Sequence, residues 1–206
     1  MLKKAERIIG NETADEGLRR LEAERMREVA GKSTGWWNNE FMFNLSKSSS
    51  GLRDAELSLG FVGYDMSSDP RCVEKGLISQ VSLCYEGVPI ANSSVMVRKP
   101  GGRVEAVIEV LQGMGNAGQM EKFRTATGEH WNIFLANAIK DAAYESGFNR
   151  VLLRDITTTK DYERPFMLRG KTIAETRELM QQLYTRTRKQ CGFTKREGDY
   201  FVREFP

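Results

Sequence analysis

Residues 138–155, AIKDAAYESGFNRVLLRD, decide the fold because they pass from a helix directly into a buried strand. Six apolar residues around the start of this stretch share one helix face: Phe134, Leu135, Ala138, Ile139, Ala142 and Ala143. Thr127 is the expected N-cap of this helix and Gly147 its expected end. NRVLLRD, residues 149–155, is a short apolar run between charged ends, typical of a strand buried on both faces. With a strand before the helix, this unit favours a parallel pair of strands.

The sequence before this helix has the period of strands. Three segments show this period: ELSLGFVGYD (56–65), LISQVSLCYEGVPIANSSVMVRK (77–99) and RVEAVIEVLQGM (103–114). The middle segment predicts a hairpin that turns at residues 86–89, and Pro100 with two glycines predicts a second turn. We therefore expect three or four consecutive antiparallel strands, followed by a glycine-containing loop over residues 115–128.

The sequence after the buried strand predicts a long loop, a last helix and a closing strand pair. Residues 155–171 are polar and contain Pro165, and loops of this length are often lids or binding loops. TIAETRELMQQLYTRTRKQ begins with Thr172 three residues before Glu175, the spacing of a capping box. GFTKREGDYFVREF then predicts two strands around residues 197–199.

We expect the first 50 residues to be an N-terminal extension to a single domain over residues 51–206. Residues 1–30 predict a helix, and residues 31–51 predict a connection because they are rich in glycine and serine. Four aromatic residues in this connection are not typical of a solvent-exposed linker: Trp36, Trp37, Phe41 and Phe43. We expect them to dock on the body of the fold, with a partner surface as the alternative.

Composition excludes several classes of protein. A hydrophobic fraction of 40% with 29% charged residues is that of a folded globular chain, not a disordered one. No apolar run is long enough for a membrane helix and no signal peptide is evident, so we expect no membrane association and a cytoplasmic protein. Three scattered cysteines and one histidine indicate neither a disulfide framework nor a metal site.

The basic residues are concentrated near the last helix. The net charge of +3 alone does not indicate nucleic-acid binding, because that inference needs the charges on one surface. The densest group comprises Arg186, Arg188, Lys189, Lys195 and Arg196. This group is either a nucleic-acid contact or a solvated helix face.

The order of these elements resembles the GNAT (N-acetyltransferase) superfamily over roughly residues 56–206. AIKDAAYESGFNRVLLRD resembles the family's central helix and fifth strand, and QCGFTKREGDYFVREF resembles its final Gly-Phe and terminal hairpin. The resemblance implies an α/β (α+β) fold, with a mixed, mostly antiparallel sheet and flanking helices. Another βαβ fold is the alternative.

The resemblance also implies acetyl-CoA or another acyl-CoA as cofactor. Pantetheine would lie along the fourth strand, against Leu111, Gly113 and Met114, with its pyrophosphate at the start of the next helix. The matching loop residues would be Arg124, Thr125, Thr127 and Gly128. This loop departs from the family pattern, which has a second glycine or alanine, and Glu129 adds a carboxylate where a diphosphate would sit.

The catalytic residues implied by the resemblance are two carboxylates and a tyrosine. Glu105 and Glu109 lie four apart on the fourth strand, hence on one face, and either would serve as general base. The alternative for each is an ion-paired strand residue. The family's usual tyrosine position is occupied by Arg188, so Tyr184, one helical turn earlier, would be the general acid only in a shifted helix.

Two hypotheses of function follow. In the first, the chain is an acyl-CoA dependent N-acyltransferase whose acceptor is an amine on a small molecule or a protein. In the second, the same fold has lost catalysis and binds a protein or nucleic acid. The sequence leaves a homodimer open, and a third, enzymatic alternative has the long loop as a lid over another ligand. His130, at the start of the central helix, is either an acid–base residue or a structural one.

Overall fold

The computed structural model describes part of the chain. The described residues are 41, 44, 45, 55–60, 77–98, 100–163, 165 and 170–206, of which 55–60 and 77–79 are described for the backbone alone. The chain divides into two compact units, Met1–Glu40 and Phe41–Pro206. The predicted N-terminal helix, Trp36, Trp37 and Phe43 lie outside the described residues.

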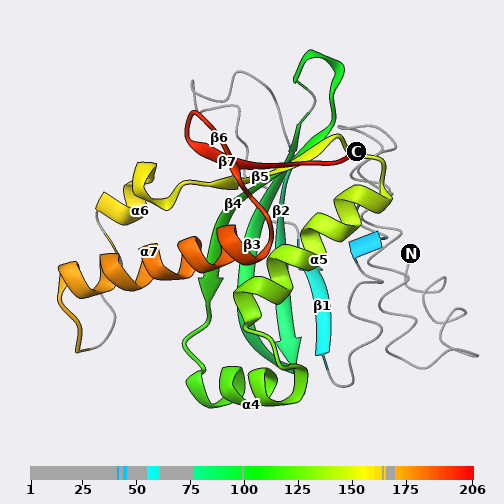
Figure 1. The fold of residues 1–206 in the computed structure, drawn as a ribbon. Coiled ribbons are helices and arrows are strands. Elements are labelled where there is room, and N and C mark those ends of the chain that lie inside the picture. Colours follow the sequence, from blue (N-terminus) through cyan, green and yellow to red (C-terminus); the bar gives the residue numbers. More distant parts are fainter. Residues whose placement is uncertain are drawn as a thin grey trace, which may run out of the picture. The chain divides into compact units, whose positions relative to one another are not determined.

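One seven-stranded sheet forms the centre of the second unit (Figure 1). Its strands are β1 Ala55–Gly60, β2 Leu77–Tyr85, β3 Val88–Arg98, β4 Glu105–Gly113, β5 Arg150–Arg154, β6 Lys195–Glu197 and β7 Tyr200–Glu204. They lie in the order β1-β2-β3-β4-β5-β7-β6. Among the strands that the structure describes, only β4 and β5 pair in parallel. The predicted mixed, mostly antiparallel sheet is therefore confirmed, including its parallel pair.

Tight turns join β2 to β3 and β3 to β4. Glu86 and Gly87 connect the first pair with φ of 51° and 73°, the positive values that two-residue hairpin turns require. This turn is two residues shorter than predicted, because Val88 and Pro89 belong to β3. The 3₁₀ turn η2, Pro100–Gly102, joins β3 to β4 where the second turn was predicted.

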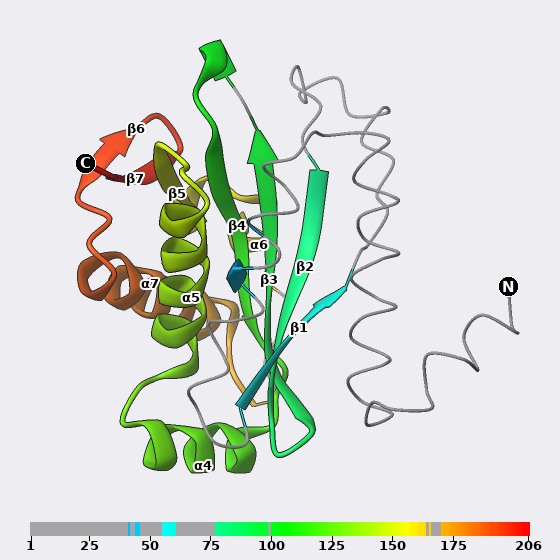
Figure 2. The ribbon, with the colours of Figure 1, turned by 90° about the vertical axis from the view of Figure 1, so that its right-hand side faces the viewer.

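Two helices lie beside each other on one face of the sheet (Figure 2). They are α5, Trp131–Glu145, and α7, Ile173–Gln190. The apolar face predicted for α5 is buried, with Leu135, Ile139 and Ala142 fully inaccessible to solvent. The predicted capping box at the start of α7 is present, with Thr172 accepting from the Glu175 N–H and Glu175 accepting from the Thr172 N–H.

Residues 115–128 are not the predicted loop, because most of them form helix α4, Ala117–Thr127. Asn116 caps this helix by accepting from the Gln119 N–H, and Gly128 ends it in the left-handed conformation. Phe123 is fully buried and meets the rings of Tyr85 and Phe134 edge to face, at 5.6 and 5.4 Å between centroids. This tertiary packing outweighs the weak helix propensity of the glycine and threonine residues. Thr127 is accordingly not the N-cap of α5.

The long loop predicted over residues 155–171 also contains helical turns. The 3₁₀ turn η3, Ile156–Thr158, follows β5 directly, and the short helix α6, Lys160–Glu163, follows η3. Asp155 caps η3, since its carboxylate accepts from the Thr157 N–H at 3.1 Å. Residues 164 and 166–169 lie outside the described part of the chain, so the structure does not test the lid.

Part of the predicted aromatic connector packs on the sheet unit. Phe41 is fully buried, and its ring stacks on that of Phe148 with centroids 5.3 Å apart. Asn44 donates from its side-chain amide to the Ser146 hydroxyl at 3.0 Å. The prediction that these aromatic residues dock on the body of the fold is therefore confirmed for Phe41.

Candidate functional site

Strands β4 and β5 part halfway along β4. They pair from Glu105 with Arg150 to Ile108 with Leu153, after which β4 continues to Gly113 without β5. At the point of parting, the register with β3 shifts so that Glu109 has no partner residue. Such a bulge bends a strand and redirects its side chains. The sheet therefore opens between Glu109 and Gly113.

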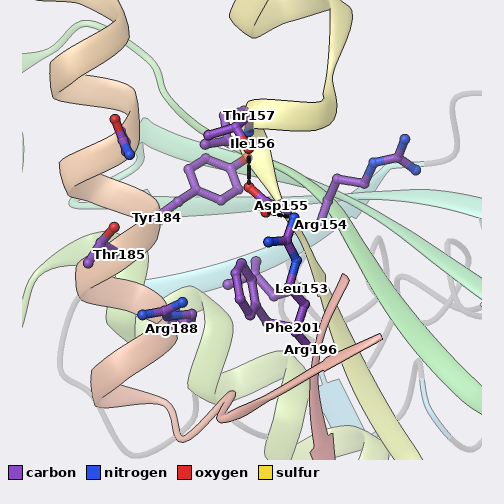
Figure 3. Close-up of a pocket in the computed structure, with 11 residues that line it drawn as sticks. Leu153, Arg154, Asp155, Ile156, Thr157, Tyr184, Thr185, Arg188, Arg196 and Phe201 are labelled. Atoms are coloured by element: carbon purple, nitrogen blue, oxygen red, sulfur yellow. Dashed lines mark hydrogen bonds and ion pairs between the residues drawn. The ribbon is translucent and has the colours of Figure 1, made fainter. Parts of the chain in front are cut away.

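Tyr184 of α7 reaches into this opening from the helical face. Its hydroxyl accepts a hydrogen bond from the Leu111 N–H at 2.8 Å. Only 7% of Tyr184 is exposed, and burial raises the pKa of its hydroxyl well above the usual value. Figure 3 shows the ring projecting from α7 toward the end of β5. Tyr184 thus stands at the parted strands without any shift of the helix.

Glu109 lies on the other face of the opening, with Arg154 and Tyr200. Leu153 and Phe201 line a cavity with α7, so their strand neighbours Arg154 and Tyr200 point to the opposite face. Glu109 accepts from the Tyr200 hydroxyl at 3.2 Å and lies 3.5 Å from an Arg154 nitrogen. Burial and the nearby Glu109 charge raise the pKa of Tyr200. Glu109 therefore connects β4 to the end of β5 across the gap.

Glu105 is held in a structural ion-pair network. The residue is fully buried, and its two carboxylate oxygens contact Arg98 and Arg150. Arg98 also stacks on Tyr200, which places Glu105 and Glu109 on the same face as predicted. Because protein side chains enclose its carboxylate, the contacts favour the ion-paired alternative for Glu105, and Glu109 is the better candidate base.

The four residues predicted to form a pyrophosphate loop belong to the end of α4 instead. Thr125 and Thr127 donate from their hydroxyls to backbone carbonyls of their own helix, and Arg124 pairs with Glu121 at 3.2 Å. The Gly128 N–H donates to the Arg124 carbonyl at 2.8 Å, so it is not free for an anion. The prediction that residues 124–128 form a loop is therefore wrong.

The start of α5, two residues later, is a second candidate position for an anion. His130 is its N-cap but makes no side-chain capping bond, and the first N–H groups of a helix have no partner within it. A nitrogen of Arg186 lies 3.2 Å from His130 Nε2. Burial lowers the pKa of His130, and the charges of Arg186 and Arg124 lower it further. Arg186 therefore places a positive charge beside this helix end, where the helix dipole is also positive.

Glu129 does not obstruct the start of α5. Its carboxylate accepts from the Asn137 side-chain amide at 3.1 Å, two helical turns along α5. Burial raises the pKa of Glu129 above its ordinary value. The repulsion predicted between Glu129 and a diphosphate is reduced because the carboxylate is directed along the helix.

Leu111, Gly113 and Met114 have different environments. The Leu111 N–H lies in the opening, whereas a Cβ on Gly113 would come within 2.8 Å of Met120 and 3.3 Å of Trp131. Met114 is half exposed and donates its N–H to the Ile90 carbonyl. Of these three predicted contacts, only Leu111 faces Tyr184.

A groove runs along α7 beside the start of α5. It measures about 640 Å³ and is lined by Glu178, Gln181, Gln182, Thr185, Arg186, Lys189 and Gln190. Asn132 of α5 donates to the Thr187 hydroxyl at 2.8 Å and so joins the two helices. Arg186 connects the groove with His130 at the helix end.

The five basic residues named as a nucleic-acid contact do not act as one group. Lys195 pairs with Glu197 and Glu204, and Arg196 pairs with Asp155. Arg186 and Lys189 line the groove, whereas Arg188 and Arg196 line a separate cavity. Acidic neighbours thus compensate part of this charge.

Sequence reasoning missed Arg154 and Tyr200. Arg154 follows an apolar run at the carboxyl end of a parallel strand, where functional side chains collect in α/β sheets, and this signal could have identified it. Tyr200 has no such local signal, because its contact with Glu109 spans 91 residues of sequence.

No protein-family model matches the chain, and no curated protein matches it. Within the described residues, no cluster of His, Cys, Asp and Glu is suited to a metal ion. No helix in that part of the chain has the length and apolarity needed to cross a membrane. The mixed sheet with flanking helices is compatible with a GNAT-like α/β fold.

Proposed function

We propose that the chain is an acyl-CoA dependent N-acyltransferase with a GNAT-like fold. The observation that carries this proposal is the opening between the parallel strands β4 and β5, with Glu109 on one face and Tyr184 on the other. A β-strand edge freed from its partner offers N–H and C=O groups to an extended ligand. Pantetheine, which contains two amide groups, has the chemistry to pair with such an edge.

The charges around α5 support a cofactor that carries a diphosphate. Arg186 and the uncapped start of α5, beside the His130 ring, offer positive charge and backbone N–H groups together. The adjoining groove of about 640 Å³ has the size of a nucleotide-binding site and contains Lys189 as a second cation. In this arrangement, the diphosphate binds at His130 and the nucleotide follows α7.

The proposed transfer uses one base and one acid. Glu109 takes a proton from the acceptor amine, whose nitrogen attacks the thioester carbonyl, so that a C–N bond forms and the C–S bond breaks. Tyr184 gives its proton to the departing thiolate, and the proton on Glu109 returns to Tyr184 through solvent. The raised pKa of Tyr184 keeps its hydroxyl protonated for this role. Before transfer, the thioester must displace the Tyr184 hydroxyl from the Leu111 N–H.

Calorimetry and a thiol-release assay test the proposal. We expect saturable heat with acetyl-CoA and, with a panel of amines, release of free thiol that falls about 10²- to 10⁴-fold in Glu109→Gln. Glu145→Gln is the matched control, because Glu145 is exposed and lies in the last turn of α5. Absence of heat with acetyl-CoA and longer acyl-CoAs would refute the proposal.

A second candidate is a binding module of the same fold without catalysis. The position of Tyr184 favours this candidate, because the Tyr184 hydroxyl already accepts the hydrogen bond of the Leu111 N–H and its buried ring lies in the opening. The partner would be a protein or a nucleic acid contacted through Arg186 and Lys189. Salt-sensitive RNA or DNA binding without acyl-CoA binding would support this candidate. A cytoplasmic location and a homodimer stay predictions.

A further inference from the structure

A small cavity lies on the helical face of the sheet, beside Tyr184 (Figure 3). It measures about 240 Å³, below the roughly 300 Å³ at which pockets for drug-sized ligands begin. The end of β5 with η3, one face of α7, and the β6–β7 hairpin enclose it. Its lining residues are Leu153, Arg154, Asp155, Ile156, Thr157, Gln181, Tyr184, Thr185, Arg188, Arg196 and Phe201. A ligand of this cavity must be small.

Arg188 gives the cavity an uncompensated positive charge. Its guanidinium carbon lies 4.5 Å from the centroid of the Phe201 ring, which orients the side chain. None of the carboxylates among the described residues pairs with Arg188. Its planar set of N–H donors is therefore held in place and available, which is the arrangement that binds a carboxylate through two parallel hydrogen bonds.

The second arginine of the cavity, Arg196, is largely neutralised. It lies 2.9 Å from an Asp155 carboxylate oxygen, and the other oxygen of Asp155 accepts from the N–H and hydroxyl of Thr157. Figure 3 shows the Phe201 ring between the side chains of Arg188 and Arg196. Arg154 borders the cavity at the end of β5, but its side chain pairs with Glu109 on the opposite face. The charged side chains that remain are Arg188, Arg196 and Asp155, which leave the cavity with one net positive charge, so a monoanion matches it.

Neutral hydrogen-bonding groups accompany Arg188 on the same face of α7. Gln181, Thr185 and Arg188 recur at intervals of four and three residues, the spacing of one helix face. Gln181 and Thr185 make no side-chain hydrogen bond among the described residues. Their amide and hydroxyl groups are thus free to bind the polar part of a ligand.

We propose that this cavity binds the carboxylate of a small acid, and that the acyl acceptor is an amine bearing that carboxylate. The first half stands on the cavity alone, and the second half rests on the proposed acyltransfer. Tyr184 connects the two, because its side chain lines the cavity while its hydroxyl lies at the Leu111 N–H. An acid held by Arg188 would keep its amine close to the thioester.

Nuclear magnetic resonance of arginine side chains tests the cavity without acyl-CoA. The probe is benzoate, with neutral benzamide as its isosteric control and inorganic phosphate as the competing anion. We expect benzoate to shift the Arg188 Nε–Hε resonance saturably, and its Kd to rise about tenfold in Arg188→Lys and further in Arg188→Ala. Arg103→Ala is the matched control, because Arg103 is exposed in the turn before β4.

Each of four outcomes would overturn the proposal: no saturable shift with benzoate, an equal shift with benzamide, equal weakening in Arg103→Ala, or binding of phosphate without benzoate. For the acceptor, thiol release with acetyl-CoA should be faster with leucine than with leucinamide, and Arg188→Lys should remove the difference. Failure of acetyl-CoA binding removes the acyltransfer but leaves the benzoate result intact, so the two failures are distinguishable.

Discussion

Replacing Tyr184 with phenylalanine removes a hydroxyl that has two roles in this account: it accepts the hydrogen bond of the Leu111 N–H, and it is the proposed general acid. The substitution leaves the buried Leu111 N–H without an acceptor, which costs about 1–3 kcal/mol of the free energy of unfolding. For a chain of this size, each kcal/mol lowers Tm by roughly 2–4 °C, so Tyr184→Phe should melt about 2–12 °C lower. Tyr144→Phe is the control, because Tyr144 is 55% exposed.

The same variant should change acyl-CoA binding and turnover in opposite directions. The thioester no longer competes with the Tyr184 hydroxyl for the Leu111 N–H, so acetyl-CoA should bind Tyr184→Phe more tightly than the wild type. Loss of the acid should lower kcat by about 10²- to 10⁴-fold. Thermal melting, calorimetry and thiol release measure the three quantities. If Tyr184→Phe keeps its Tm, its Kd and its kcat, the assignment of Tyr184 to the opening is wrong.

Three further predictions concern charges and caps. Glu105→Gln should lower the free energy of unfolding by about 3–5 kcal/mol in chemical denaturation, because it leaves Arg98 and Arg150 without their buried counter-charge. Glu109→Gln should lower it much less. Glu129→Gln should raise Tm at pH 7 but not at pH 4. The raised pKa of Glu129 means that the folded state disfavours the ionised carboxylate. This penalty lowers stability above the pKa of Glu129 in the unfolded chain and is absent below it. Thr172→Ala should lower stability by about 1 kcal/mol through loss of the capping box of α7, and an equal cost in Thr185→Ala would contradict that reason.

The strands and the two large helices could be predicted because their local signals agree with their tertiary environment. The alternating strands and the apolar face of α5 bury the residues that their patterns predict, and the Thr172–Glu175 cap and the final hairpin form where their local signals place them. Helix α4 was missed because its stability depends on Phe123 packing against Tyr85 of β2 and Phe134 of α5, which are contacts between different elements. Propensity alone cannot detect such a contact.

The candidate site was only partly accessible from the sequence for a similar reason. The sequence identified Glu109 and Tyr184 as candidates. It did not show that Glu109 is a better candidate than Glu105, or that residues 124–128 do not form a loop, because these depend on the bulge in β4 and on helix α4. The direction of the Glu129 carboxylate, the pairing of Arg196 with Asp155 and the contact of Arg154 with Tyr200 are side-chain arrangements across the fold. No spacing in the sequence encodes them.

The opening at β4 is tested most directly by the backbone amide resonance of Leu111 during titration with acetyl-CoA. If pantetheine lies along the freed edge of β4, this resonance shifts saturably with the Kd measured by calorimetry, while the amide of Gly198 in the β6–β7 turn stays unchanged. If the Leu111 amide does not move at saturating acetyl-CoA, the cofactor does not enter between β4 and β5, and the acyltransferase proposal fails.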